Sequence, residues 1–333
     1  MKLFNLDLHV AVIGDVKDIF NTLYGNRIKI VSWSISGHKH LFGLGPDHVD
    51  IVNEKTWMNI DEEMIEQFHV RWGWYMVQFD GFIVTHSPVF AMLYEKYNKP
   101  IIVVNSCRYD MPYCWTKKPN KLNEALRRMV ERKQLTIISN NLNDYLYIKE
   151  RAGIKTCVIP SICQYIGVKH EPSSPQAVLF GQTYDFGRRE LFPAGNWLIK
   201  KPVNYKYSEI MKFKCAVHIP YDTSVMTISE HYWNYMPVFF PSKRFYKQCI
   251  LDRTMCLHHY YNEQMTMAQL DKLLEGADYY AFPYINYYDS YEEVKTLVEN
   301  FTDPDREKRI SWIENTKQHI YGAWMQVLPF SKK

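Results

Sequence analysis

The 333-residue sequence lacks several features that would place it in a simple class. It has seven Cys, an odd number, and no Cys-x2-Cys pair, so the sequence indicates neither a zinc site nor a disulfide framework. No stretch approaches the roughly eighteen uninterrupted apolar residues of a membrane-spanning helix. The N-terminus has no apolar signal-peptide core followed by a cleavage site. We therefore expect an intracellular, cytoplasmic protein with reduced thiols and at most peripheral membrane contact.

A strong charge of one sign is also missing. The formal net charge is +4, with 23% charged and 47% hydrophobic residues, which is typical of a globular chain. So mild a charge argues against a nucleic-acid groove as the main function, and we expect no nucleic-acid partner. It still allows a local site for an anionic diphosphate.

Short apolar runs alternate with segments of helical period in the first half of the chain. This alternation predicts a doubly wound parallel α/β sheet. The runs that predict strands are Leu8–Ile13, Ile28–Trp33, Gly81–Thr85, Ile101–Val104, Leu135–Ser139 and Thr156–Ile159. The helical segments lie at about 15–23, 61–78, 88–97, 120–132 and 141–152.

A polar stretch rich in Pro and Ser, His170–Pro175, separates this half from a second α/β pattern. We expect an N-terminal domain over 1–168, a C-terminal domain over 176–303, and final helices over 304–333 that pack back on the first domain. The second pattern predicts strands at Ala177–Phe180, Trp197–Ile199, Cys215–Ile219, Val238–Phe240 and Thr254–Leu257, with helices at 205–213, 224–235, 267–275 and 290–300.

The most informative motif begins at the end of the predicted strand Cys215–Ile219. Pro220 and Tyr221 form a turn, and Asp222 follows it. Glu230 lies on a predicted helix, with seven residues between it and Asp222. A second strand then opens with Pro237-Val238. This pattern resembles the donor-site motif of GT-B fold glycosyltransferases of the retaining Glu-x7-Glu (family 4-like) group, with Asp222 in place of the first Glu and Met236 in place of Gly.

The resemblance implies a GT-B fold, with two Rossmann-like domains facing across a cleft, and a hexosyl- or pentosyltransferase. The donor would be a nucleotide-diphosphate sugar, used as co-substrate without a cofactor or a metal. The resemblance places Glu230 on the ribose of the donor and Asp222 near the transferred sugar. It assigns further donor contacts to Gly181, Gln182, Arg188, Arg189, Lys201, Tyr221 and Ser224, with Gln182 standing where relatives have an Arg.

The first domain would present the acceptor, a glycan or glycoconjugate. Polar residues follow its predicted strands, where the loops of an α/β fold bind ligands. His86 and Asp110 are the catalytic candidates there, and Gly37 and His38 are candidates for the acceptor side. His38 and His40 alone do not predict a metal site, because the sequence shows no evident third ligand.

Two alternatives remain at this level. A nucleotide-sugar epimerase shares the fold and would consume the donor without an acceptor. A non-catalytic carbohydrate-binding relative would bind the donor without turnover, and the missing Arg at Gln182 is consistent with this class.

Overall fold

The protein folds into two compact units in a computed structural model that describes residues 1–37, 45–47, 49–115, 119–181, 189–202, 204–257 and 266–328. One unit contains Met1–Ser161 together with His319–Lys333, and the other contains Ile162–Gln318. Each unit is built on one sheet, and every pairing among the described strands is parallel. The expected α/β architecture with two parallel sheets is confirmed.

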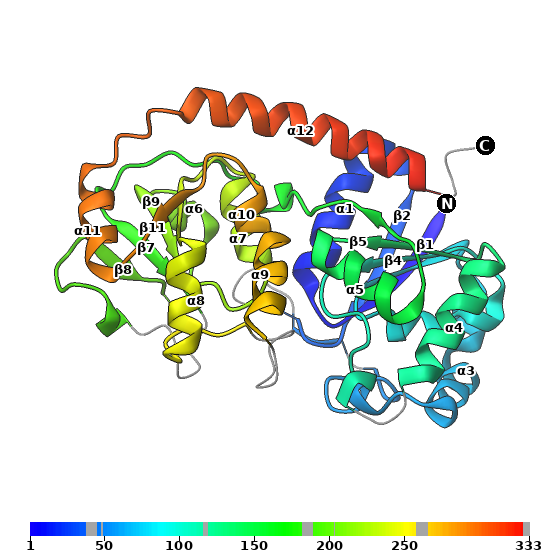
Figure 1. The fold of residues 1–333 in the computed structure, drawn as a ribbon. Helices are drawn as coiled ribbons and strands as arrows, with labels where there is room; N and C mark the ends of the chain where they lie inside the picture. Colours follow the sequence, from blue (N-terminus) through cyan, green and yellow to red (C-terminus); the bar gives the residue numbers. More distant parts are fainter. Residues whose placement is uncertain are drawn as a thin grey trace. The chain divides into compact units, whose positions relative to one another are not determined.

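The first sheet has the strand order β2-β1-β3-β4-β5-β6 (Figure 1). Its strands are β1 Lys2–Asp7, β2 Lys29–Ser34, β3 Gly81–His86, β4 Ile101–Asn105, β5 Leu135–Ser139 and β6 Cys157–Val158. The helices of this unit are α1 Val10–Tyr24, α3 Glu62–Met76, α4 Pro119–Glu131 and α5 Leu142–Ala152, with short 3-10 turns η1 Gly25–Arg27, η2 Trp57–Asn59, η3 Pro88–Leu93, η4 Glu95–Tyr97 and η5 Tyr113–Trp115.

A large apolar core covers one face of this sheet. Alternate strand residues such as Phe4, Phe82 and Val103 contact buried side chains of α3, α4 and α5, among them Phe68 and Leu126. Because side chains alternate across a strand, the intervening residues face the opposite layer. Several of those residues, such as Leu3, Ile83 and Ile102, are also apolar and buried, which is typical of a parallel sheet that is covered on both faces.

The position predicted for the first strand was wrong. The run Leu8–Ile13 was expected to be a strand, but the strand is Lys2–Asp7 and Val10–Ile13 open helix α1. All four residues of that run are buried, so the run lacks the polar positions that would have revealed a helical period. The segment 88–97 is likewise not an α-helix but the two 3-10 turns η3 and η4, with Pro88 in the first turn of η3.

The second sheet has the order β11-β10-β9-β7-β8. Its strands are β7 Ala177–Phe180, β8 Leu198–Lys200, β9 Cys215–His218, β10 Val238–Pro241 and β11 Asn286–Tyr288. The helices are α6 Tyr207–Ile210, α7 Met226–Tyr232, α8 Lys243–Leu251, α9 Met267–Glu275, α10 Asp278–Ala281 and α11 Tyr291–Asn300, with 3-10 turns η6 Gln164–Ile166 and η7 Arg189–Leu191.

One strand predicted for the second sheet is wrong. The segment Thr254–Leu257 is not a strand, and the edge of the sheet is formed by β11 instead. Met255 and Leu257 are buried, so their apolar character reflects packing in the core and not pairing in the sheet. The strand β11 is short and half polar, which left it without a clear alternating pattern.

A single long helix, α12 Arg306–Val327, closes the described chain. Near its start the buried Arg309 donates to both carboxylate oxygens of Asp303, at 2.6 and 2.7 Å. Its last turns belong to the first unit, where the Trp324 ring lies 5.6 Å from that of Phe20. No described helix is both long and apolar enough to cross a membrane.

Candidate functional site

A small cavity of about 150 Å³ opens at the carboxyl ends of β7, β8 and β9. The order of the second sheet reverses at β7, which is flanked by β8 and β9, and ligands of open α/β sheets bind at such a switch point. The residues that line the cavity follow these strands or begin α7: Phe180, Gly181, Lys201, His218, Ile219, Pro220, Tyr221, Val225, Thr227 and Ile228. Three predicted donor contacts, Gly181, Lys201 and Tyr221, therefore meet at one place.

Gly181 packs closely against the wall of this cavity. A Cβ atom at this position would lie 3.1 Å from the Cβ of Ile219, closer than most side-chain contacts in proteins. Because Ile219 also belongs to the cavity, a larger residue at position 181 would push on the lining itself.

Lys201 supplies a positive charge to the cavity. Its ammonium lies 5.2 Å from the centre of the Tyr205 ring and 6.0 Å from that of Phe180. Burial lowers the pKa of Lys201, and the negative charge of Glu230 acts against that shift. A partly desolvated ammonium of this kind attracts phosphate oxygens more strongly than one in bulk water.

Glu230 lies in α7, two residues beyond the cavity-lining Ile228, and is buried. Its Oε1 atom accepts hydrogen bonds from the hydroxyls of Tyr165 and Tyr207, the latter at 2.8 Å. Burial raises the pKa of Glu230, while the two hydrogen bonds and the charge of Lys201 oppose the rise. The Oε2 atom receives no hydrogen bond from the part of the chain that the structure describes.

Asp222 lies in the turn before α7 and is buried beside a second carboxyl group. Its Oδ1 accepts from the amide of Thr223 at 2.7 Å. The Thr223 carbonyl in turn accepts from the amide of Asp278 at 3.0 Å, and Ser224 donates its hydroxyl to Asp278 at 2.5 Å. Burial raises the pKa of Asp278 to about 7, and the charge of Asp222 adds to the rise. Ser224, predicted to bind the donor, thus bonds to an acid that the sequence did not reveal, because 54 residues separate the pair.

Two buried imidazoles, one of them from the cavity lining, lie side by side in this unit. His218 Nε2 and His231 Nδ1 lie 2.9 Å apart, so the N–H of one ring donates a hydrogen bond to the ring nitrogen of the other. Burial lowers the pKa of His218 to about 3 and holds that of His231 well below its ordinary value. Both rings are therefore neutral at physiological pH and act as polar but uncharged core groups.

Histidine also gathers at the switch point of the first sheet, between β1 and β3. The His86 ring, directly at the end of β3, stacks on the His9 ring at 6.0 Å and meets that of Trp57 at 6.3 Å. His86 has a φ of 74°, a left-handed conformation that is unfavourable for a residue with a side chain. Backbone strain of this kind is concentrated at functional positions, so His86 stays a candidate site residue.

Asp110, the other catalytic candidate of this unit, is held in an ion pair. Arg108 donates to its two oxygens at 2.7 and 3.2 Å, and the Tyr147 hydroxyl donates at 3.1 Å. Its charge is compensated by these neighbours.

A buried acid that the sequence did not single out lies at the end of β1. Asp7 Oδ1 accepts from the Ser34 hydroxyl at 3.1 Å, and no described residue donates to its Oδ2. Burial raises the pKa of Asp7 to about 7, whereas Ser34 and the charge of Lys17 oppose the shift. Its position as the last residue of a strand was the available signal, but the misplaced first strand hid it.

The acceptor-side candidates are only partly described. Gly37 has a φ of 60°, and a Cβ there would lie 2.5 Å from the carbonyl carbon of Gly45, so the turn requires glycine. His38, Gln182 and Arg188 lie outside the described residues, as does the side chain of Arg189.

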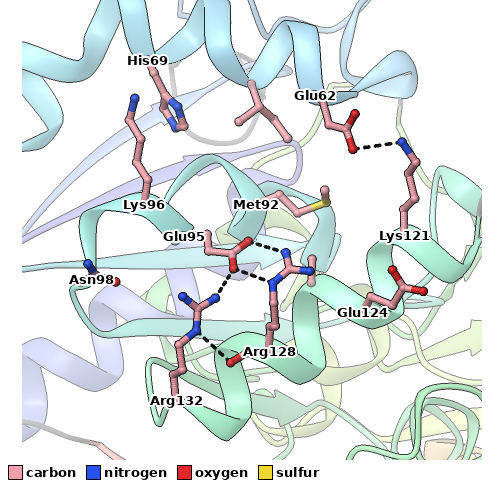
Figure 2. A pocket seen from close by; sticks show the side chains of 12 residues that line it. Glu62, His69, Met92, Glu95, Lys96, Asn98, Lys121, Glu124, Arg128 and Arg132 are labelled. Atoms are coloured by element: carbon pink, nitrogen blue, oxygen red, sulfur yellow. Dashed lines mark hydrogen bonds and ion pairs between the residues drawn. The ribbon is translucent and has the colours of Figure 1, made fainter.

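A larger hollow of about 580 Å³ lies in the first unit between α3, the 3-10 turns η3 and η4, and α4. Figure 2 shows Glu95 reaching toward both Arg128 and Arg132, while Lys121 bonds to Glu62 at 3.0 Å. Four basic side chains face three acidic ones here, so most of the charge is neutralised within the pocket. The strand ends at the two switch points remain better candidates for chemistry.

No protein-family model and no curated protein matches the sequence. Among solved structures, the glycotransferase of kitacinnamycin superposes with a TM-score of 0.50 at 8% identity, over 98% of this chain and 99% of that one. The chain has the GT-B fold. The fold expected from the Asp222-x7-Glu230 motif is thereby confirmed, including the long C-terminal helix.

Two further superpositions were found with epimerases. A UDP-N-acetylglucosamine 2-epimerase matches with a TM-score of 0.49 at 9% identity, over 100% of this chain and 97% of that one. The UDP-GlcNAc 2-epimerase from Methanocaldococcus jannaschii matches with a TM-score of 0.45 at 10% identity, over 90% and 99%. Because one fold hosts many reactions, the fold alone leaves the reaction open.

Proposed function

We propose that the protein is a glycosyltransferase that moves a hexosyl or pentosyl group from a nucleotide-diphosphate sugar to a hydroxyl of a glycan or glycoconjugate. The observation that carries this proposal is the cluster of Glu230, Tyr165, Tyr207 and Lys201 beside the cavity at the ends of β7, β8 and β9. It combines a carboxyl group that accepts hydrogen bonds with a half-buried cation, which match the ribose hydroxyls and the diphosphate of a nucleotide sugar.

The carboxylate suits the ribose of the donor. Both tyrosines bond to Oε1, so Oε2 is left to accept from hydroxyl groups of a ligand. A carboxylate that accepts from hydroxyls forms charge-assisted bonds, which are stronger than neutral ones. Glu230 is 3% exposed, and we therefore expect donor binding to require a small rearrangement around it.

The cation suits the diphosphate. Lys201 faces the cavity, and Gly181 lets the chain pass closely by Ile219 at its wall. Basic side chains and backbone amides can neutralise a leaving diphosphate without a metal ion. Arg188 and Arg189 are proposed as further phosphate contacts from the sequence alone, and Gln182, Tyr221 and Ser224 as donor contacts.

In the proposed reaction the acceptor oxygen bonds to the anomeric carbon of the sugar. The bond from that carbon to the diphosphate oxygen breaks, and the nucleoside diphosphate leaves with the bonding electrons. The acceptor hydroxyl loses its proton to a base, for which we favour His86, because Asp110, the other candidate in the first unit, is held in the ion pair with Arg108. We assign Asp222 to the transferred sugar, and Gly37 and His38 to the acceptor side.

The decisive experiment is a donor screen. The protein is incubated with a panel of nucleotide sugars, with and without glycan acceptors, and released nucleoside diphosphate is measured. Acceptor-dependent release supports a transferase. Donor isomerisation without an acceptor indicates the epimerase alternative, and binding without turnover indicates a carbohydrate-binding protein. The exposed Glu275→Ala is a matched control for Glu230→Ala, since it removes a carboxylate from the same unit.

A further inference from the structure

Helix α3 carries an exposed apolar stripe. Val70, Trp74 and Val77, at and just beyond its last two turns, are 79%, 65% and 57% exposed. Their spacing of four and three residues places them on one face, while Phe68 and Met76 on another face are buried in the core. Adjacent large apolar groups left in water commonly mark a binding surface.

A basic edge lies at the amino-terminal ends of the strands of the first sheet. Because parallel strands start at the same edge, the segments 1–2, 26–29, 77–81, 95–101, 131–135 and 149–157 are neighbours there. They contain four acidic residues, Asp80, Glu95, Glu131 and Glu150, against ten basic ones, Lys2, Arg27, Lys29, Lys96, Lys99, Arg132, Lys133, Lys149, Arg151 and Lys155. The whole chain has a net charge of only +4, so the rest of it is slightly acidic.

Helix dipoles explain only part of this charge. Cations are favoured in the last turn of a helix, which accounts for Lys149 and Arg151 in α5. Lys2 and Lys29 lie in strands, and Lys99 and Lys155 lie just before strands. No helix dipole favours a cation at these four positions.

The stripe and the basic edge meet at the end of α3. The Lys99 ammonium donates a hydrogen bond to the carbonyl of Val77 at 2.7 Å. The ammonium of Lys2 lies 4.6 Å from the centre of the Phe79 ring and 5.8 Å from that of Tyr75. The end of α3 therefore joins exposed apolar side chains to a row of cations.

We propose that this surface, formed by the α3 stripe and the basic edge, docks the protein on a membrane that contains anionic lipids. A helix with an exposed Trp and apolar neighbours inserts shallowly at the headgroup level, and each nearby Lys or Arg adds about 1 kcal/mol of attraction to an anionic leaflet. A second copy of the chain is a poorer occupant, because two such basic edges repel each other. Seven of the ten basic residues are Lys, a residue that is depleted at protein–protein interfaces.

The test is co-sedimentation of the full chain with phosphatidylcholine vesicles, with and without phosphatidylserine. We expect binding only with phosphatidylserine, and release at high salt because exposed charges are screened. Trp74→Ser with Val77→Ser should weaken binding at least tenfold, as should the charge reversal of the exposed Lys29, Lys133 and Lys155 to Glu.

Matched controls separate this surface from charge or apolarity in general. Leu251→Ser removes an exposed apolar residue of the second unit, and reversal of the exposed Lys212, Lys272 and Lys308 changes the net charge equally. Thermal unfolding verifies that all variants are folded.

Absence of binding to anionic vesicles at low salt overturns the proposal. Equal losses in the control reversal also overturn it, because attraction would then follow net charge alone. If Trp74→Ser instead converts an oligomer to a monomer and leaves vesicle binding unchanged, the stripe is an interface between copies. None of these outcomes depends on glycosyltransferase activity.

Discussion

The two units each contain a buried carboxylate near the carboxyl ends of the strands, yet they hold it differently. Asp110 in the first unit is paired with the guanidinium of Arg108 and bonded by Tyr147, so both of its oxygens are occupied. One oxygen of Glu230 in the second unit accepts hydrogen bonds from two neutral hydroxyls. The charge of Lys201 acts on Glu230 without a hydrogen bond between them. A fully compensated carboxylate stabilises the fold, whereas a partly compensated one retains capacity to bind a ligand.

The largest effect should come from breaking the compensated pair. Asp110→Ala removes the carboxylate to which both Arg108 and the Tyr147 hydroxyl donate, so we expect the free energy of unfolding to fall by about 3 kcal/mol. Denaturant unfolding measures the loss. A change below about 0.5 kcal/mol would show that Asp110 is not structural, and the two sites would then no longer differ as described.

Acid should weaken the second unit through its neutral imidazoles. The folded pKa of His218 is about 3, below the ordinary 6.5, so its contribution to stability is complete above pH 6.5 and declines as the pH falls toward 3. Between pH 7 and 5 this amounts to about 2 kcal/mol. His218→Gln keeps a polar group beside His231 without a titrating ring and should shrink the acid-induced loss by that amount. Equal losses in both proteins would mean that His218 is protonated in the folded state.

Removing the partly compensated carboxylate should act on donor binding. A charge-assisted bond to ribose contributes about 1.5–3 kcal/mol, so Glu230→Ala should weaken binding of the donor nucleotide about tenfold or more. Glu230→Gln keeps one acceptor oxygen and should lose less. Calorimetry with the donor found in the screen measures both, with Glu275→Ala as control. Unchanged affinity in a folded Glu230→Ala protein would remove Glu230 from the site.

The smallest effect concerns the tyrosines that hold Glu230. Tyr207→Phe deletes one hydrogen bond to Oε1, which should weaken donor binding about fivefold and raise the pKa of Glu230 further. Donor affinity in this variant should therefore begin to fall at a higher pH than in the wild type as acid is added. A pH profile identical to that of the wild type would show that Tyr207 packs beside Glu230 without orienting it.

The sequence predicted the second-unit motif better than the surroundings of its residues. Strands β7 and β9 fall where the apolar runs placed them, because short buried runs bounded by Gly or Pro have few other solutions. The partners Tyr165, Tyr207 and Asp278 were not predicted. Each lies between 23 and 65 residues from its partner, and no local pattern encodes such distant contacts.

Apolar periodicity alone determined that this chain forms two parallel α/β patterns, since burying both faces of a sheet demands apolar strands and amphipathic helices between them. The motif around Asp222 and Glu230 added the fold family. Only the tertiary structure decided which carboxylates are compensated, because charge compensation depends on side chains brought together by sheet order. It also placed the cations of the basic edge in one row, since only parallel strand order aligns the starts of distant segments.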